Sequence, residues 1–211
     1  MFSPMQKDLL IELLNIHIGQ SANTLSEMIN ERVLLSIPEM EVIKDYNTNI
    51  LDILYPGQLK LNEILISSIT FGKRFHGKAF IVFPPINARS LINACLCVPK
   101  SAQLITTSNY DESDLDILKE ISNVILNALI GEFGNLLNIK MEYTAPDIHS
   151  TLKSSIEEII SFSKETVILV LHSKFSLGGN EMAGSILVSL GTDSIALMIE
   201  KINILLGELN G

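Results

Sequence analysis

Cysteine and histidine are scarce in this chain, which has two and four of them in 211 residues. Cys95 and Cys97 form a C-x-C pattern, which is too small for a zinc cage and too closely spaced for a comfortable disulfide. We therefore expect two buried thiols in a reducing cytosol. No H-E-x-x-H or similar ligand pair is present, because the histidines are spread singly at His17, His76, His149 and His172. These absences exclude the common metalloenzyme patterns.

Other signals of function or location are also missing. The sequence has no Walker A loop, no G-x-G-x-x-G and no G-x-S-x-G. It has no uncharged apolar run near the ~18 residues of a membrane span. The 15 basic against 24 acidic residues give a net charge of −9, without the basic footprint of a nucleic-acid-binding protein. Lys7, Asp8 and Glu12 interrupt any signal peptide, so we expect a cytoplasmic protein.

What the chain does have is apolar residues. They make up 47% of the sequence, only 18% is charged, and the mean hydropathy is +0.34. This composition excludes wholesale disorder and predicts a full hydrophobic core. The length fits one large domain or two small repeats.

Periodicity predicts one order of elements that occurs twice. Ser3, Pro4 and Gln6 form a capping box at the start of a long helix that ends near Asn30. The first half continues with a strand, a short helix, a hairpin and a helix, at 33–42, 47–54, 64–71 with 78–83, and 88–95. A linker at 99–110 follows. The second half repeats this order, with a long helix at 113–137, an extended segment at 140–143 and a helix at 151–162. A hairpin at 166–173 with 184–190, around a turn at Gly178 and Gly179, and a closing helix at 194–206 follow.

The two halves align with a shift of 107 to 108 residues, which indicates an internal duplication. Two repeats, at about 1–98 and 111–211, favour a single closed domain with pseudo-twofold symmetry over a solenoid. The predicted class is α+β, with long helices packed on a mostly antiparallel sheet.

The duplication keeps a polar pattern, D-x-x-x-E-x-x-N, on both long helices. Steps of four and three place these side chains on one helical face, away from the apolar stripe. Gly19 and Asn127 extend that face by one turn, and their modest size would let a partner approach. A proline follows each asparagine after 23 residues, so the two copies read Asp8, Glu12, Asn15, Pro38 and Asp116, Glu120, Asn123, Pro146.

The pattern suits one kind of chemistry. A carboxylate can bind a lysine or arginine, and a carboxamide can orient a water while staying neutral beside phosphoryl oxygens. An amide is too weak a base to abstract a proton. The pair therefore suits hydrolysis of an already activated phosphate, where positioning supplies most of the catalysis. A row of such residues can also be only the solvated face of a helix.

At these positions the sequence resembles the CheC family of chemotaxis phosphatases, which includes CheX and the phosphatase part of FliY. The segments ELLNIHIGQSANTLSEM and VLLSIPE are similar to the family's first helix and following strand. Leu14 and Ser122 stand where the family often has glycine, and His17 is bulkier than the usual residue. The resemblance spans essentially the whole chain. Two complete motifs without an added domain are most similar to the CheC branch.

The resemblance implies a duplicated CheC-like fold and hydrolysis of the phosphoaspartate of a CheY-type response regulator. Glu12 or Glu120 would pair with the regulator's lysine, and Asn15 or Asn123 would orient the attacking water. The regulator would supply Mg²⁺, so no cofactor of the chain's own is expected, and CheD would be a second partner. The residues expected to contact the regulator are Asp8, Gly19, Asp116 and Asn127.

Two alternatives remain open on the sequence alone. The chain could be a non-catalytic adaptor that binds CheD or a response regulator without changing the lifetime of the phosphate. It could also be a dimerisation module whose apolar residues cover an interface. The expected state of the phosphatase is a monomer or a weak dimer, with no nucleic-acid partner.

Overall fold

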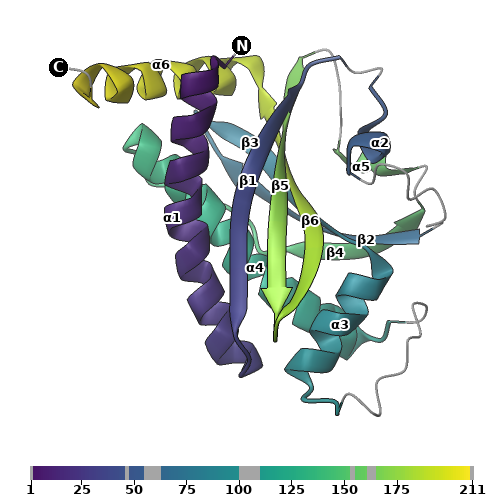
Figure 1. Cartoon of the computed structure of the whole chain (residues 1–211). Helices are drawn as coiled ribbons and strands as arrows, with labels where there is room; N and C mark the ends of the chain where they lie inside the picture. The colour runs from purple at the N-terminus through teal and green to yellow at the C-terminus, as the bar shows by residue number, and fades with distance from the viewer. Residues whose placement is uncertain are drawn as a thin grey trace.

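Six helices and one antiparallel sheet of six strands make up the described part of the chain (Figure 1). The computed structural model describes residues 2–45, 48–54, 63–99, 110–152, 155–160 and 165–209. The helices are α1 (Pro4–Ile29), α2 (Ile50–Leu54), α3 (Pro85–Cys95), α4 (Glu112–Leu137), α5 (Ile156–Ile160) and α6 (Thr192–Leu209). The strands are β1 (Val33–Ile43), β2 (Glu63–Gly72), β3 (His76–Phe83), β4 (Asp147–Leu152), β5 (Thr166–Leu177) and β6 (Asn180–Gly191).

Local signals explain where several of these elements begin and end. The Ser3 hydroxyl accepts the Gln6 N–H, and the Gln6 side chain accepts the Ser3 N–H, so the predicted capping box starts α1. Gly178 and Gly179 have φ of +55° and +87° in the turn between β5 and β6, a conformation that favours glycine.

The sheet order shows the pseudo-twofold symmetry of the fold. The strands lie in the order β1-β5-β6-β3-β2-β4, so each half contributes a hairpin and the two hairpins meet at β3 and β6. The first strand of each half pairs with the hairpin of the other half, β1 with β5 and β4 with β2. The predicted α+β class and duplicated fold are therefore confirmed.

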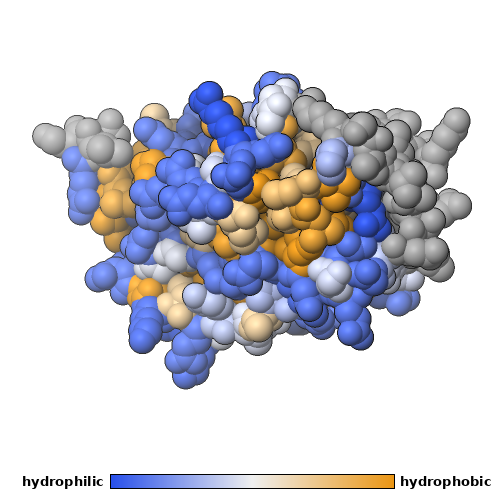
Figure 2. Space-filling model, turned by 90° about the horizontal axis from the view of Figure 1, so that it is seen from below, coloured by the Kyte–Doolittle hydropathy of each residue, from blue (hydrophilic) through white to orange (hydrophobic). Residues whose placement is uncertain are grey.

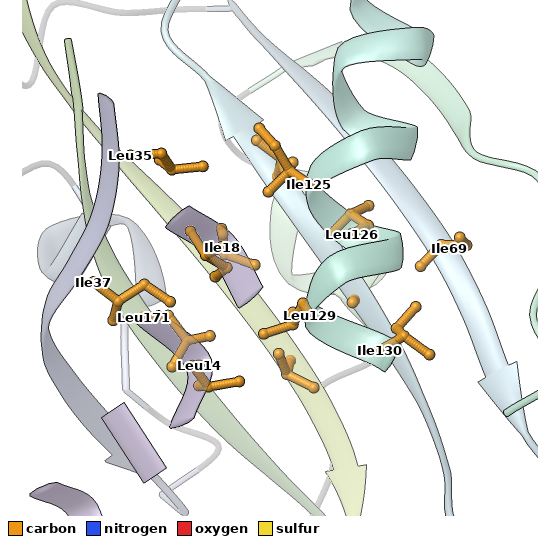
Figure 3. Packing of buried hydrophobic residues seen from close by; sticks show 14 of the residues in the cluster. Leu14, Ile18, Leu35, Ile37, Ile69, Ile125, Leu126, Leu129, Ile130 and Leu171 are labelled. Atoms are coloured by element: carbon orange, nitrogen blue, oxygen red, sulfur yellow. The ribbon is translucent and has the colours of Figure 1, made fainter. Parts of the chain in front are cut away.

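Helices cover both faces of the sheet (Figure 1). The larger core lies between the sheet and helices α1, α3, α4 and α6, and a smaller one lies beneath α2 and α5. Within the larger core, Leu14 and Ile18 of α1 lie near Ile37 and Leu171 of the sheet (Figure 3). Leu126 of α4 is part of the same core. No helix in the described ranges is both long and apolar enough to span a bilayer.

Two local predictions are wrong, at least in part. Residues 140–143 form only an isolated bridge between Tyr143 and Phe71, flanked by hydrogen bonds from the Gly72 N–H to the Glu142 carbonyl and from the Thr144 N–H to the Thr70 carbonyl. The continuous ladder with β2 begins at Asp147, after Pro146. Within the helix expected at 151–162, Thr151 and Leu152 belong instead to β4, and the described helix is α5. Residues 161–162 and most of the predicted linker, 100–109, lie outside the described residues.

The expectation of two buried thiols is also wrong in part. Cys95 ends α3 and is half-buried, whereas Cys97 is exposed. Cys97 lies just beyond the helix with φ +53°, where its N–H donates to the Ala94 carbonyl and the Val98 N–H donates to the Asn93 carbonyl. These two bonds are those of a Schellman motif, which turns the chain, and the Cys97 side chain, away from the core.

Candidate functional site

The first copy of the polar motif lies in the middle of α1. Asp8 and Glu12 are exposed, while Leu10 and Leu14 on the opposite side of the helix are fully buried. The helical spacing therefore places both carboxylates toward solvent, as the sequence predicts. Asn15 differs from them, because its side chain is half-buried.

The Asn15 amide is bound to the backbone of β1. Its Nδ2 donates to the Ile37 carbonyl oxygen at 2.8 Å, and its Oδ1 accepts the Ile37 N–H at 2.7 Å. The pairing of β1 with β5 shifts register between Ser36 and Glu39, so Ile37 lies where the ladder is interrupted. The sequence predicts only that this amide points away from the apolar stripe, and its contact with β1 is an additional feature of the structure. One Nδ2–H and one Oδ1 lone pair remain for any other partner.

The second copy lies in the same place on α4 but has different contacts. Asp116 and Glu120 are exposed, and Asp116 contacts Lys119 at 3.3 Å. Asn123 is half-buried, and its Oδ1 accepts a hydrogen bond of 2.9 Å from Nδ2 of Asn127, one turn further along α4. Among the described residues, the Nδ2 group of Asn123 has no hydrogen-bond partner.

The two copies differ because the strand after each helix differs. In the first copy β1 runs through Pro38, and its interrupted ladder leaves the Ile37 backbone for Asn15. In the second copy β4 begins only at Asp147, after Pro146, and no hydrogen bond joins Asn123 to this segment within the described ranges. The second amide is therefore the one with both N–H groups available.

The positions that follow the motif also differ. Gly19 occupies on α1 the place of Asn127 on α4, and a Cβ built on Gly19 would meet nothing within 4 Å. The surface beside the first copy is therefore open, as the sequence predicts. Asn127 is half-buried and its Nδ2 donates to Asn123, and its contact with a partner stays a prediction.

A polar cluster that the sequence did not reveal joins the two long helices. Glu132 of α4 is almost fully buried, and its Oε2 lies 2.6 Å from Nδ1 of His17 on α1. Asn135 lies 3.2 Å from Glu132 and 3.3 Å from His17. The repeat alignment gives no signal for this cluster, because the equivalents of Glu132 and His17 are Thr24 and Ile125. His17, bulky for its position, thus has a structural partner.

A shallow hollow of about 360 Å³ lies between the two long helices beside this cluster, and we call it the α1–α4 seam. It is lined by His17, Gln20, Ser21, Thr24, Val124, Asn127, Ala128, Gly131 and Asn135. The seam places Asn127, and with it the second copy of the motif, next to polar groups of α1.

Contacts at its N-terminus fix α4 against α3. The Asp111 carboxylate caps the helix by accepting the Asp114 N–H at 2.9 Å. That bond, and a second from the Ser113 hydroxyl, lower the pKa of Asp111 below its usual value. Arg89 of α3 donates to Asp114 at 2.8 Å and lies over the Tyr110 ring at 4.7 Å. These contacts hold the helix that carries Glu120 and Asn123.

The site holds no metal-binding cluster of its own. In the part of the chain that the structure describes, no group of three or more histidine, cysteine, aspartate or glutamate side chains could hold a metal ion. The motif side chains are carboxylates and carboxamides: carboxylates bind cations, and carboxamides donate to oxygens and orient water.

Solved structures with the same fold carry names from flagellar and chemotaxis proteins. FliY from Thermotoga maritima matches with a TM-score of 0.75 and 17% identity, over 96% of this chain and 98% of that one. The FliM middle domain from H. pylori matches with 0.65 and 13%, over 95% and 99%. The chemotaxis protein CheX from Desulfovibrio desulfuricans matches with 0.50 and 13%, over 85% and 99%.

Because the sequence identities are low, these structural similarities show the fold alone. No protein-family model matches the sequence. The chain has the fold found in FliY, in the FliM middle domain and in CheX.

Proposed function

We propose that this protein is a phosphatase that hydrolyses the phosphoaspartate of a CheY-type response regulator, and that it belongs functionally with the CheC branch. The proposal is supported by the doubled motif and by a fold like those of FliY and CheX. The observation that carries it is that exposed Glu120 and the half-buried Asn123 amide lie three residues apart on α4, and that Nδ2 of Asn123 has no hydrogen-bond partner among the described residues.

The proposed reaction needs positioning more than acid–base strength. The Asn123 amide would hold a water in line with the phosphorus, while Glu120 would bind the regulator's lysine. The water oxygen bonds to phosphorus as the bond from phosphorus to the aspartate oxygen breaks. The products are a free carboxylate and inorganic phosphate, and the water's proton passes to the phosphate or to solvent. The regulator would hold the Mg²⁺ that offsets the developing charge.

The two copies would contribute unequally. Asn15 uses one N–H and one oxygen lone pair in hydrogen bonds to the Ile37 backbone, whereas both N–H groups of Asn123 are without a partner among the described residues. We therefore assign most of the activity to the second copy and treat the first as a weaker site. Asp116 would contribute to docking beside Glu120, and the reaction would take place in the cytoplasm, where we expect the regulator.

The test is phosphate release from a panel of phosphorylated receiver domains. The variants are Asn123→Ala and Asn15→Ala, with Asn23→Ala as a matched control because Asn23 is an exposed α1 asparagine outside the motif. We expect Asn123→Ala to slow release about 100-fold, since loss of a positioned water has effects of that order. Wild-type protein that accelerates no receiver domain's dephosphorylation would refute the proposal.

A non-catalytic adaptor is the second candidate, and two observations favour it. The FliM middle domain matches with a higher TM-score than CheX, and structures of FliM in complex with FliG and with SpeE are among the neighbours. In addition, hydrophobic side chains gather within the polar lower face (Figure 2). A hollow of about 610 Å³ beside α3 has apolar lining residues that include Ile29, Ile86, Val98, Leu177 and Met182.

The same assay, with a measurement of binding affinity beside it, separates the two candidates. An adaptor would bind a receiver domain, or CheD, with an affinity that Asn123→Ala leaves unchanged, and the phosphate would keep its lifetime. A phosphatase would shorten that lifetime and lose the effect in the variant.

A further inference from the structure

The side chains of Asn123 and Asn127 form a two-membered amide ladder on α4. Nδ2 of Asn127 donates to Oδ1 of Asn123 at 2.9 Å, across one turn of the helix. Side chains four residues apart on a helix are close enough for such pairs. The bond occupies one lone pair of the Asn123 oxygen and fixes which end of its amide faces away from Asn127.

The position of Asn127 on α4 is energetically unfavourable for an asparagine side chain. Its own Oδ1 is buried and has no hydrogen-bond partner among the described residues. A buried acceptor without a partner destabilises the fold, and asparagine is a poor helix former. Val124, Ala128 and Gly131 lie around it on α4 in the seam. Among the residues that the structure describes, the hydrogen bond to Asn123 is the one that the Asn127 side chain makes.

In the first copy the oxygen of the motif asparagine also accepts an N–H, but from a different donor. Oδ1 of Asn15 accepts an N–H from the Ile37 backbone at 2.7 Å, and Gly19 provides no side chain at the position of Asn127. In both copies the motif oxygen therefore accepts one N–H. The donor is backbone in the first copy and a side chain in the second.

We propose that Asn127 is a positioning residue for Asn123, an inference that rests on the proposed phosphatase function. By donating to Oδ1, it fixes the amide so that both N–H groups and the second oxygen lone pair face the docked phosphoaspartate. Asn127 itself does not touch the regulator in this account. Its effect on the reaction passes through the orientation of the neighbouring amide.

The test uses the full chain carrying Asn15→Ala, so that only the second copy is active. Single-turnover release of phosphate from an acetyl-phosphate-treated CheY-type receiver domain is measured against protein concentration. Asn127→Ala should lower the maximal rate about tenfold and leave the half-saturating concentration within about twofold. Asn127→Gln should restore the rate to within about threefold, because glutamine can also donate to an asparagine four residues away.

Two kinetic results would overturn the inference. One is an unchanged maximal rate in Asn127→Ala while Asn123→Ala is inactive, which leaves the proposed function intact. The other is a raised half-saturating concentration with an unchanged maximal rate, because this would make Asn127 a docking residue. Equal melting temperatures of the variants exclude a folding effect.

A second measurement tests the contact whether or not the protein is active. In ¹H–¹⁵N spectra, the Asn123 side-chain amide should give one sharp pair of resonances in the parent and in Asn127→Gln. It should shift and broaden in Asn127→Ala as the amide gains rotational freedom. An Asn123 resonance pair unaffected by Asn127→Ala refutes the positioning role, even if no receiver domain proves to be a substrate.

Discussion

The side chain of Asn15 and the backbone of Ile37 exchange two hydrogen bonds, of 2.8 and 2.7 Å, between the middle of α1 and an irregular point of β1. The bonds replace the sheet pairing that β1 loses between Ser36 and Glu39. Pro38 follows directly, and since proline has no N–H it does not add a second unpaired donor there. The spacing from asparagine to proline in the first copy therefore has a structural meaning.

Replacing Asn15 should destabilise the protein. Asn15→Ala leaves the N–H and carbonyl of Ile37 without partners beside a fully buried side chain, and we expect a loss of about 1–3 kcal/mol in the free energy of unfolding. Asn123→Ala should cost about 1 kcal/mol or less, because it breaks one hydrogen bond between half-buried side chains and leaves no backbone group without a partner. Urea unfolding measures both, with Asn23→Ala as the exposed control. Equal losses in Asn15→Ala and Asn23→Ala would show that the contact with β1 is not stabilising.

Removing the carboxylate of Glu120 should weaken docking and spare the fold. Glu120 is exposed, and single exposed charges contribute little to folding. Glu120→Ala should raise the KM for the phosphorylated receiver domain roughly tenfold at low salt, and the difference from wild type should shrink as salt screens the pair. The matched control is Glu27→Ala, an exposed α1 glutamate outside the motif. A KM that Glu120→Ala leaves unchanged at low salt would remove Glu120 from the interface.

The cap at the start of α4 should make stability depend on pH. The Asp114 N–H and then the Ser113 hydroxyl lower the pKa of Asp111 below 3.8, so the ionised carboxylate favours the folded state. Its contribution is present above about pH 4 and is lost as the pH falls through the lowered pKa of the folded state. Asp111→Asn keeps an acceptor but does not ionise. Wild type should therefore be the more stable of the two at pH 7, and the difference should shrink at an acid pH, below the usual carboxyl pKa of 3.8. A difference of the same size at both pH values would contradict this role.

The two thiols should react at different rates. Burial, and then the neighbouring Cys97, raise the pKa of Cys95, so its reactive thiolate is rarer at neutral pH. Cys97 is exposed beyond the end of α3. With limiting iodoacetamide at pH 7.5, peptide mass spectrometry should find Cys97 alkylated first, and Cys97→Ser should leave a slowly reacting protein. Faster labelling of Cys95 would mean that α3 ends differently in solution.

The features that the sequence predicts correctly are those that depend on residues close together in the chain. The capping box of Ser3 and Gln6 and the turn at Gly178 and Gly179 are formed by neighbouring residues, so the sequence places them correctly. The repeated order of elements likewise predicts the symmetric sheet, because each apolar period already indicates helix or strand. The helix bearing Glu120 and Asn123 also follows from its period, as does the exposure of both glutamates.

The contacts that distinguish the two copies are not local. Asn15 meets Ile37 only where β1 loses its pairing with β5, and that irregularity depends on the register of a strand from the other half. His17 and Glu132 belong to different helices and have no equivalents in the repeat alignment. The strand expected at 140–143 failed for a similar reason, because the pairing partner and not the local sequence sets where β4 begins.

The most direct test of the account compares the two asparagines in one experiment. The lifetime of phosphoaspartate on a CheY-type receiver domain is measured with wild type, Asn15→Ala and Asn123→Ala at equal concentrations of folded protein. We predict that Asn15→Ala keeps most of the acceleration and that Asn123→Ala loses most of it, since only the second amide has both N–H groups available. Full acceleration by Asn123→Ala, or its loss in Asn15→Ala alone, would contradict the assignment of the active site.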